Sequence, residues 1–242
     1  MKKILIFIRA YFFLLVSPFK SKKTILNSVD TVKFVKKNKK SIIRYGDGEF
    51  RIMLTSKNID YQKASAKLSN DLIKIVDSYN NDSNYLLCLP PFLKENIIWY
   101  FLKPSKYTLC FSIWRLFFKK KMKKMIYGDA FLFKNGNLNV YESLWKDSKN
   151  IILVHNNVKW ANALKSRYKC NVEFIEVPSE NSYDKIDSIY DKIIQKLNSS
   201  KMEYTILISA GPMAKVLVYR LAKVGIVSYD TGHCFDEPLN LE

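Results

Sequence analysis

From residue 41 onward, the sequence alternates short, continuous apolar runs with longer amphipathic stretches. Runs such as IILVH and ILISA lack the polar–apolar alternation of half-exposed strands and are typical of parallel strands buried on both faces. The stretch 213–224 instead repeats its apolar residues at helical spacing, which predicts a helix with one face toward a core. This alternation predicts an α/β fold, a Rossmann-like three-layer sandwich with a mostly parallel sheet.

No linker rich in Pro, Gly or Ser divides the 242 residues. We expect one domain over residues 41–242, preceded by an N-terminal apolar and basic helical segment over residues 1–40. The expected strands cover residues 41–45, 85–89, 130–133, 151–155, 172–177, 204–209 and 226–229. The expected helices cover residues 62–80, 94–102, 113–126, 157–168, 182–198 and 213–224.

The cysteines give no sign of a metal site or a disulfide framework. None of the four lies in a C-x-x-C pair, and neither of the two histidines stands at zinc-ligand spacing from a cysteine. Reduced thiols of this kind suit a cytoplasmic compartment.

Positive charge is concentrated in two segments. The chain has 40 basic and 22 acidic residues, a net charge of +18. Residues 1–40 hold eleven basic residues and one acid, and residues 103–128 hold eight basic residues and no acid. Such patches indicate an anionic partner, either a membrane surface or a nucleic acid. A basic composition shared by the whole proteome is the alternative.

The N-terminal segment is apolar but short. Its longest uncharged run covers residues 10–19, about half the length that a membrane-spanning helix needs. It lacks the cleavage site of a signal peptide, and Arg9 interrupts what would be the apolar region. A helix lying in the membrane interface fits this pattern, and a helix packed on the domain's own core fits it equally well.

A second segment, 111–126, places aromatic residues beside a cluster of lysines: Lys119, Lys120, Lys121, Lys123 and Lys124. Aromatic rings settle at the level of lipid headgroups, and each lysine near an anionic leaflet adds about 1 kcal/mol. We find no RNP signature, helix-turn-helix pattern or zinc finger, which argues against nucleic acid as a partner. We therefore expect a cytoplasmic protein held peripherally on the inner face of the cell membrane.

The segment SIIRYGDGEF, residues 41–50, is the first candidate site. An apolar strand runs into a turn with two glycines, Gly46 and Gly48, which let the backbone approach a ligand. Asp47 and Glu49 are expected to be exposed on this turn and could converge on one Mg²⁺ or Mn²⁺ ion. Arg44 could reach a phosphate or pair with one of these acids. Alternatively, Asp47 caps the following helix, with Glu49 in its first turn.

The second candidate site is SAGPMAK, where another buried strand meets a helix. Gly211 and Pro212 mark the start of this helix, and a helix N-terminus attracts phosphate groups. Ser209 and Lys215 could add a hydroxyl group and a charge. An ordinary strand-to-helix turn is the alternative, since neither a G-x-G-x-x-G fingerprint nor a Walker lysine motif is present.

The third candidate site, YDTGH, follows the last apolar strand. Asp230 and His233 stand where a general base, a metal ligand or a ribose contact would lie, although a surface turn is equally compatible. His155 also closes a strand, and a hydrogen-bonded structural histidine is the favoured interpretation.

These segments together carry a family resemblance. RYGDGEF near the start and SAGPMAKVLVYRLAKVGIVSYDTGH near the end resemble the bacterial glycosyltransferases with the GT-D fold. The resemblance covers roughly residues 40–236, and GDAF at 128–131 and VPSENSYDKID at 177–187 are in keeping with it. It implies a Rossmann-like core, a nucleotide-sugar donor and a divalent ion, Mn²⁺ or Mg²⁺, held by Asp47 and Glu49.

With this resemblance, we expect an enzyme that transfers a hexose from a nucleotide sugar, a UDP-sugar being the expected donor. The acceptor would be a glycan of a surface polysaccharide or glycoprotein, lipid-linked if the basic segments hold the domain on a membrane. Asp230 or His233 would deprotonate the acceptor or position the donor. The expected binding residues are Arg44, Gly46, Gly48, Ser209, Gly211 and Lys215. The alternative is a non-catalytic peripheral membrane module that binds a nucleotide or a partner protein.

Overall fold

The computed structural model describes residues 24–94, 125–134 and 136–235, apart from the side chains of Phe92, Lys94 and His233. It also describes the single positions 8, 12, 15, 114 and 117.

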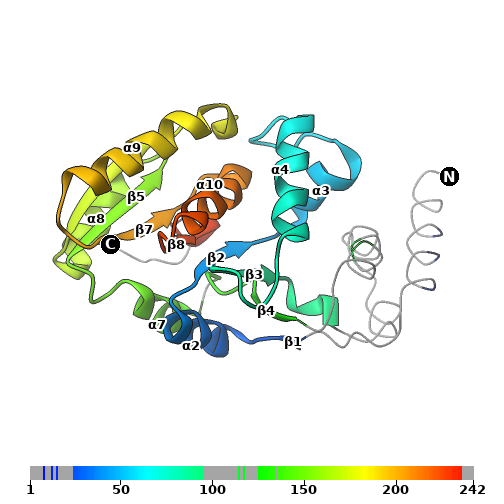
Figure 1. The fold of residues 1–242 in the computed structure, drawn as a ribbon, viewed down its shortest axis with the longest axis horizontal. Coiled ribbons are helices and arrows are strands. Elements are labelled where there is room, and N and C mark those ends of the chain that lie inside the picture. The colour runs from blue at the N-terminus through cyan, green and yellow to red at the C-terminus, as the bar shows by residue number, and fades with distance from the viewer. Residues whose placement is uncertain are drawn as a thin grey trace.

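The described residues form one eight-stranded sheet in which every strand pair is parallel. Its order is β1-β4-β3-β2-β8-β7-β5-β6, so the last strand, β8, lies in the middle of the sheet between β2 and β7 (Figure 1). The strands are β1 Thr24–Ile25, β2 Ser41–Arg44, β3 Tyr85–Leu89, β4 Ile126–Asp129, β5 Asn150–His155, β6 Asn171–Glu176, β7 Thr205–Ile208 and β8 Ser228–Asp230.

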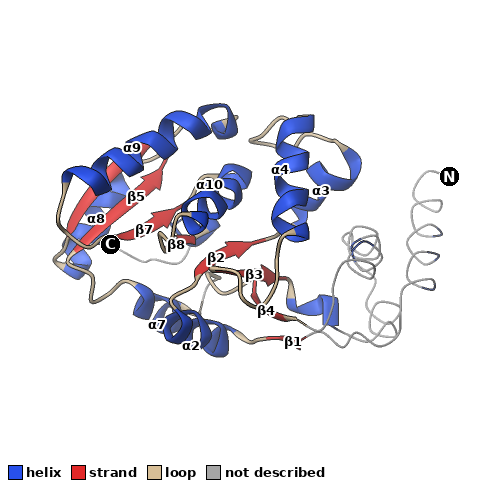
Figure 2. Ribbon diagram, in the orientation of Figure 1, coloured by secondary structure: helices blue, strands red, loops and turns tan. Residues whose placement is uncertain are grey.

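Helices cover both faces of this sheet, which confirms the predicted three-layer architecture (Figure 2). One face packs against α3 Asp47–Thr55, α4 Ala66–Asp77, α9 Ile186–Ser199 and α10 Gly211–Lys223. The other face packs against α2 Ser28–Asn38, α7 Leu138–Tyr141 and α8 Lys159–Tyr168. Four short 3-10 helices complete the described elements: Pro91–Lys94, Glu142–Leu144, Ser182–Lys185 and Gly232–Phe235.

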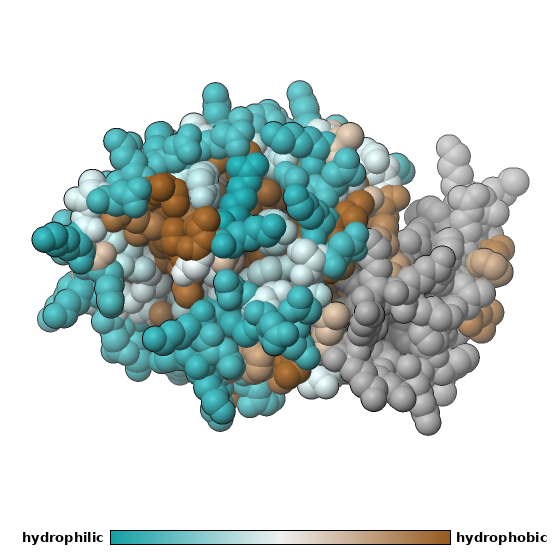
Figure 3. Space-filling view, in the orientation of Figure 1, coloured by the Kyte–Doolittle hydropathy of each residue, from teal (hydrophilic) through white to brown (hydrophobic). Residues whose placement is uncertain are grey.

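The continuous apolar runs follow directly from this burial on two faces. Successive side chains of a strand point to opposite faces of the sheet. Ile42 accordingly packs with the α2, α7 and α8 layer, whereas Ile43 packs with the α3, α4, α9 and α10 layer. Both side chains are fully buried. The outer surfaces of the helices carry the polar residues, and Figure 3 shows a mostly hydrophilic face with smaller hydrophobic areas.

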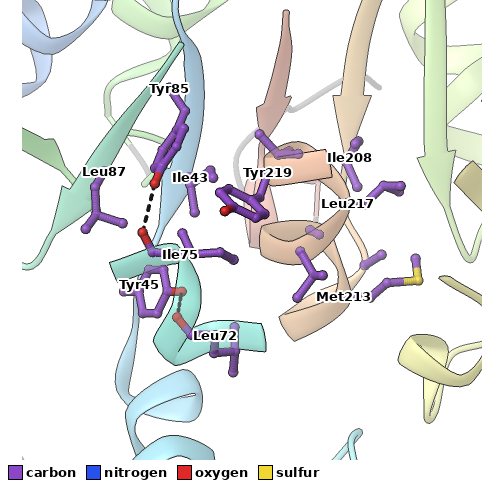
Figure 4. Packing of buried hydrophobic residues seen from close by; sticks show 14 of the residues in the cluster. Ile43, Tyr45, Leu72, Ile75, Tyr85, Leu87, Ile208, Met213, Leu217 and Tyr219 are labelled. Carbon is purple, nitrogen blue, oxygen red and sulfur yellow. Dashed lines mark hydrogen bonds between the residues drawn. The ribbon is translucent and has the colours of Figure 1, made fainter. Parts of the chain in front are cut away.

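Two tyrosine hydroxyls attach helix α4 to the sheet. The Tyr45 hydroxyl donates to the Leu72 carbonyl at 2.7 Å, and the Tyr85 hydroxyl donates to the Ile75 carbonyl at 2.8 Å (Figure 4). A buried hydroxyl needs such a partner, because leaving it unsatisfied is costly. Tyr45 thus fixes the chain one residue before the GDGE turn.

One expected strand is wrong. Residues 130–133 form a turn, and the strand in this region is β4, directly before them, which lies between β1 and β3. Strand β4 ends where its partner β3 ends, with Asp129 opposite Leu89. Gly128 lets these two strands pack closely, because a Cβ atom there would lie 2.4 Å from the Cys88 sulfur. Ala130, Leu132 and Phe133 of the turn are buried all the same, since they pack in the layer of α2 and α7.

The other expected elements agree with the structure to within a few residues where they are described. The expected helix 113–126 ends too late, because Ile126 begins β4. Most of that helix and of the expected helix 94–102 lies outside the described residues. Trp114 and Phe117 are described. Both positions are helical and pack against the core, Trp114 in ring contact with Phe50 of α3.

Residues 24–40, grouped with the N-terminal segment in the sequence analysis, supply β1 and α2 to the same sheet and core. Before them, positions 8, 12 and 15 are helical. Within the described residues, no helix is both long and apolar enough to span a bilayer.

Candidate active site

The carboxyl ends of β2, β8 and β7 lie side by side at the centre of the sheet. They lead into the three segments expected from the sequence: Tyr45–Glu49, Thr231–Gly232 and Ser209–Gly211. In open α/β sheets, the crevice beside such strand ends is the usual position of a ligand. The structure therefore brings the three candidate segments together.

These segments share a set of four charges, which we call the charge quartet: the buried Glu49, Lys215 and Asp230 and the half-buried Arg44. The Lys215 Nζ lies 3.1 Å from Glu49 Oε1 and 3.2 Å from Asp230 Oδ2. One Arg44 terminal nitrogen lies 3.8 Å from Asp230 Oδ1. Glu49, Lys215 and Asp230 expose 4%, 5% and 0% of their surface. Two cations thus balance two carboxylates, which removes most of the penalty of burying each charge.

Lys215 is the centre of the charge quartet. Burial alone would lower its pKa, but the carboxylates of Asp230 and Glu49 outweigh this effect and raise it above the ordinary value. Its ammonium group also donates to the Gly211 carbonyl at 3.1 Å. That Lys215 also contacts a ligand stays a prediction.

Arg44 pairs with Asp230 rather than with Asp47 or Glu49. Its backbone N–H donates to Asp230 Oδ2 at 3.0 Å, and its Nε donates to the Asp230 carbonyl at 2.8 Å. A further nitrogen donates to the Ala130 carbonyl at 3.0 Å, and the guanidinium lies over the Phe133 ring. Arg44 therefore joins the ends of β2, β8 and β4.

The acids of the GDGE turn point in different directions. Helix α3 begins at Asp47, with Gly46 as its N-cap and Glu49 as its third residue. Glu49 Oε2 accepts the Gly46 N–H at 2.8 Å, while its Oε1 faces Lys215. Asp47 is exposed, as expected, but the expectation that Glu49 is exposed is wrong. The cap at this helix start is thus supplied by Glu49.

Asp47 is better placed than Glu49 to bind a divalent ion. Asp47 offers an exposed carboxylate at a helix N-terminus, whereas both oxygens of Glu49 already have protein partners. Within residues 24–94, 125–134 and 136–235, no group of three or more His, Cys, Asp or Glu side chains could hold a metal. Mg²⁺ is commonly held by one or two carboxylates together with substrate phosphates, so Asp47 can serve as such a ligand.

Residues at the start of α10 also form hydrogen bonds within the protein. Ser209, expected to contact a ligand, donates its hydroxyl to the Gly232 carbonyl. Gly211 is the first helical residue and has φ +55°, a conformation that favours glycine. Helix α10 therefore begins two residues before the expected start at residue 213, and Pro212 is its second residue.

The structure describes the side chain of His155 but not that of His233. His155 is buried, its Nδ1 accepts the Asn157 N–H at 3.0 Å, and its ring packs edge-on against Phe235. This is the structural role that the sequence favoured. The side chain of His233 lies outside the described part of the chain, so its expected role stays a prediction.

Tyr61 is a site residue that the sequence analysis missed. It lies in the loop between α3 and α4, and its ring faces Gly211: a Cβ atom there would lie 2.8 Å from Tyr61 Cε2. A Cβ atom at Gly48 would lie 3.8 Å from the Tyr61 hydroxyl oxygen. Tyr61 thus borders the starts of α3 and α10. The only signal in the sequence was the presence of glycine at both helix starts.

Gly232 gives a direct test of the packing around Arg44. It has φ +54°, and a Cβ atom there would lie 1.6 Å from an Arg44 terminal nitrogen. We expect Gly232→Ala to lower the midpoint of thermal unfolding markedly, because backbone strain of about 1–3 kcal/mol adds to displacement of Arg44. Gly225→Ala is the matched control: Gly225 has φ +79° but no atom within 4 Å of the added Cβ. Equal shifts in the two variants would contradict the packing argument.

The comparisons with known proteins agree with this fold. The chain belongs to the family described as "Glycosyltransferase GT-D fold", whose profile matches residues 42–238. Its fold is therefore the GT-D fold, as the sequence resemblance implied.

The chain is 23% identical over 218 residues to "Probable glycosyl transferase Gly" of Streptococcus gordonii. This match covers 81% of the chain and 30% of the relative, so the chain spans less than a third of that protein.

Two solved structures share the fold. One, described as "The highly conserved domain of unknown function 1792 has a distinct glycosyltransferase fold", has a TM-score of 0.73 at 20% identity, over 95% of this chain and 82% of its own. The other, "A New Glycosyltransferase (DUF1792) from Streptococcus sanguinis", has a TM-score of 0.71 at 22% identity, over 87% of this chain and 81% of its own.

Proposed function

We propose that the protein transfers a hexose from a nucleoside-diphosphate sugar, with UDP-sugars as the expected donors, to a glycan acceptor. The observation that carries this proposal is the charge quartet, which fixes the starts of α3 and α10 beside each other at the central strand ends. Membership of a glycosyltransferase family supports the reaction class.

The N-termini of α3 and α10 are suited to bind the diphosphate of the donor. The free N–H groups and the positive dipole end of a helix N-terminus attract anions, and α3 and α10 are long enough to provide them, with 9 and 13 residues. Positive potential at this point also stabilises the diphosphate as it leaves the sugar, which is the electrostatic contribution that matters for transfer.

A divalent ion, Mn²⁺ or Mg²⁺, would be held by Asp47. Glu49, the second ligand that the family resemblance implies, instead faces Lys215 and the Gly46 N–H. When bound, such an ion neutralises charge on the phosphates. The chain's own contribution is to present Asp47 at the helix start and to keep Glu49 paired with Lys215 below it.

Asp230 is better suited to positioning than to acceptor deprotonation. It is fully buried, and its oxygens face Lys215 and the Arg44 backbone. A general base must reach the proton that it removes, which Asp230 does not do in this arrangement. His233 stays the proposed alternative for deprotonation.

Hydrolysis of nucleotide sugars by the purified protein tests the proposed function. UDP-, GDP- and dTDP-hexoses are incubated with enzyme and Mn²⁺, and release of the nucleoside diphosphate is measured. Enzyme-dependent release from one of these donors supports the proposal. If no donor is hydrolysed and none of the three diphosphates shifts the melting temperature, a non-catalytic membrane module becomes the better description.

We further propose that the basic segments hold the enzyme on the inner face of the cell membrane, next to a lipid-linked glycan. Ile8, Phe12 and Leu15 lie at one-face helical spacing and expose 59%, 60% and 60% of their surface. The first 23 residues carry six basic residues and no acid. The cluster Lys119–Lys124 itself lies outside the described residues.

Sedimentation with anionic vesicles tests this membrane contact. A variant with Ser at positions 8, 12 and 15 and Gln at Lys119, Lys120, Lys121, Lys123 and Lys124 should lose vesicle binding, because each lysine near the surface contributes about 1 kcal/mol. The matched control removes five exposed lysines elsewhere: Lys146, Lys149, Lys165, Lys169 and Lys192. Equal vesicle binding by the two variants, or binding that 1 M salt leaves intact, contradicts the proposal.

A further inference from the structure

The loop between α3 and α4 forms a small hairpin at the proposed donor site. Ile59 and Gln62 pair as an antiparallel bridge, with backbone hydrogen bonds of 3.0 and 3.3 Å, which places Asp60 and Tyr61 at the tip. The Asn181 N–H donates to the Tyr61 carbonyl at 2.9 Å, and Asn181 Oδ1 accepts the Lys63 N–H at 2.8 Å. The tip is therefore held in place by Asn181.

This hairpin brings the half-buried Tyr61 ring against the two helix starts. Its Cε2 would lie 2.8 Å from a Cβ atom at Gly211, and its hydroxyl oxygen 3.8 Å from one at Gly48. Glycine at each position leaves room for the ring. A side chain at Gly211 would force the ring away.

The phenol remains a hydrogen-bond donor at neutral pH. Burial and the nearby Glu49 carboxylate raise the pKa of Tyr61 to about 12, and Lys215 opposes this rise. A protonated phenol beside two helix starts can donate to a phosphate oxygen, whereas a phenolate would repel it.

We infer that Tyr61 contacts the donor: its hydroxyl donates to an oxygen of the diphosphate seated between the starts of α3 and α10. The inference rests on the proposed function and names a contact residue for the same site. Its ring also excludes water from one side of the diphosphate, which strengthens the electrostatic interactions there.

The alternative is that Tyr61 only fills the space beside Gly211. Tyr61→Phe separates the two roles, because it keeps the ring and removes only the hydroxyl. Tyr204→Phe is the matched control. Tyr204 is also half-buried, but it lies at the amino end of β7, whereas the proposed site lies at the carboxyl ends of the strands.

Calorimetric titration with UDP in the presence of Mn²⁺ measures the contact. We expect Tyr61→Phe to weaken UDP binding about tenfold at an unchanged melting temperature, as for loss of one hydrogen bond to a charged group. Tyr204→Phe should bind UDP as the wild type does.

Two results overturn the inference in distinguishable ways. If the wild type and Tyr61→Phe bind UDP equally, Tyr61 is not a donor contact, while the proposed function stands. If the wild type binds none of UDP, GDP and dTDP and hydrolyses no nucleotide sugar, the proposed function fails and the inference fails with it.

Discussion

Replacing Asp47 with asparagine should lower sugar transfer by about two orders of magnitude or more while leaving the melting temperature unchanged. Asp47 is exposed at the first position of α3, so the substitution removes a charge without disturbing the core. The loss corresponds to about 3 kcal/mol of transition-state stabilisation. Steady-state transfer assays and thermal unfolding of the same samples check both parts.

Glu49→Gln should be compared with Asp47→Asn, because the two variants are expected to differ in melting temperature. Glu49→Gln too should lose activity, but it should also lower the melting temperature, because Glu49 is buried against Lys215 and caps α3. Chelation of divalent ions should reproduce the Asp47→Asn loss in the wild type, and added Mn²⁺ or Mg²⁺ should restore activity. Full activity of Asp47→Asn, or of the wild type in excess EDTA, would remove the metal from the proposed mechanism.

The second large effect concerns the stability of the fold. Lys215→Met should reduce the free energy of unfolding by about 3–5 kcal/mol, because it leaves two buried carboxylates facing a single cation. Methionine fills most of the lysine volume, so the loss is electrostatic rather than a cavity effect. Urea unfolding followed by circular dichroism measures it.

The charge balance gives this prediction an internal control. Glu49→Gln combined with Lys215→Met restores one cation and one carboxylate, so the double variant should lose less stability than the two single losses added together. Lys196→Met, which breaks an exposed pair with Glu173, should change stability little. Additive losses in the double variant would show that Glu49 and Lys215 are not energetically coupled.

The sequence predicted the features that depend on local pattern. Continuous apolar runs such as 151–155 are strands because both faces of the sheet are covered. Helix α3 was not among the expected helices, and a helix start after the glycine-rich turn was only the alternative interpretation. Parallel strands place their carboxyl ends on the same side of a sheet, which is why the three candidate segments, each of which follows a strand, lie together.

Features that depend on tertiary partners were missed or misjudged. Glu49 was expected to be exposed because the turn is polar, yet Lys215, far along the chain, holds it in the core. Lys215 did carry a signal: it is the only charged residue between Thr205 and Tyr219, and a lone charge in an apolar run needs a buried partner. Tyr61 gave no comparable signal, since its position depends on contacts with Asn181 and Gly211.

The central position of β8 has a consequence for folding during synthesis. Arg44 emerges from the ribosome early, but its partner Asp230 follows 186 residues later. Strand β8 must then enter between β2 and β7, so neither the sheet nor the charge quartet can be completed before that strand is made. Such long sequence separations slow folding and leave strand edges open in the interim. Nascent chains that end before β8 should therefore be the ones that depend most on chaperones.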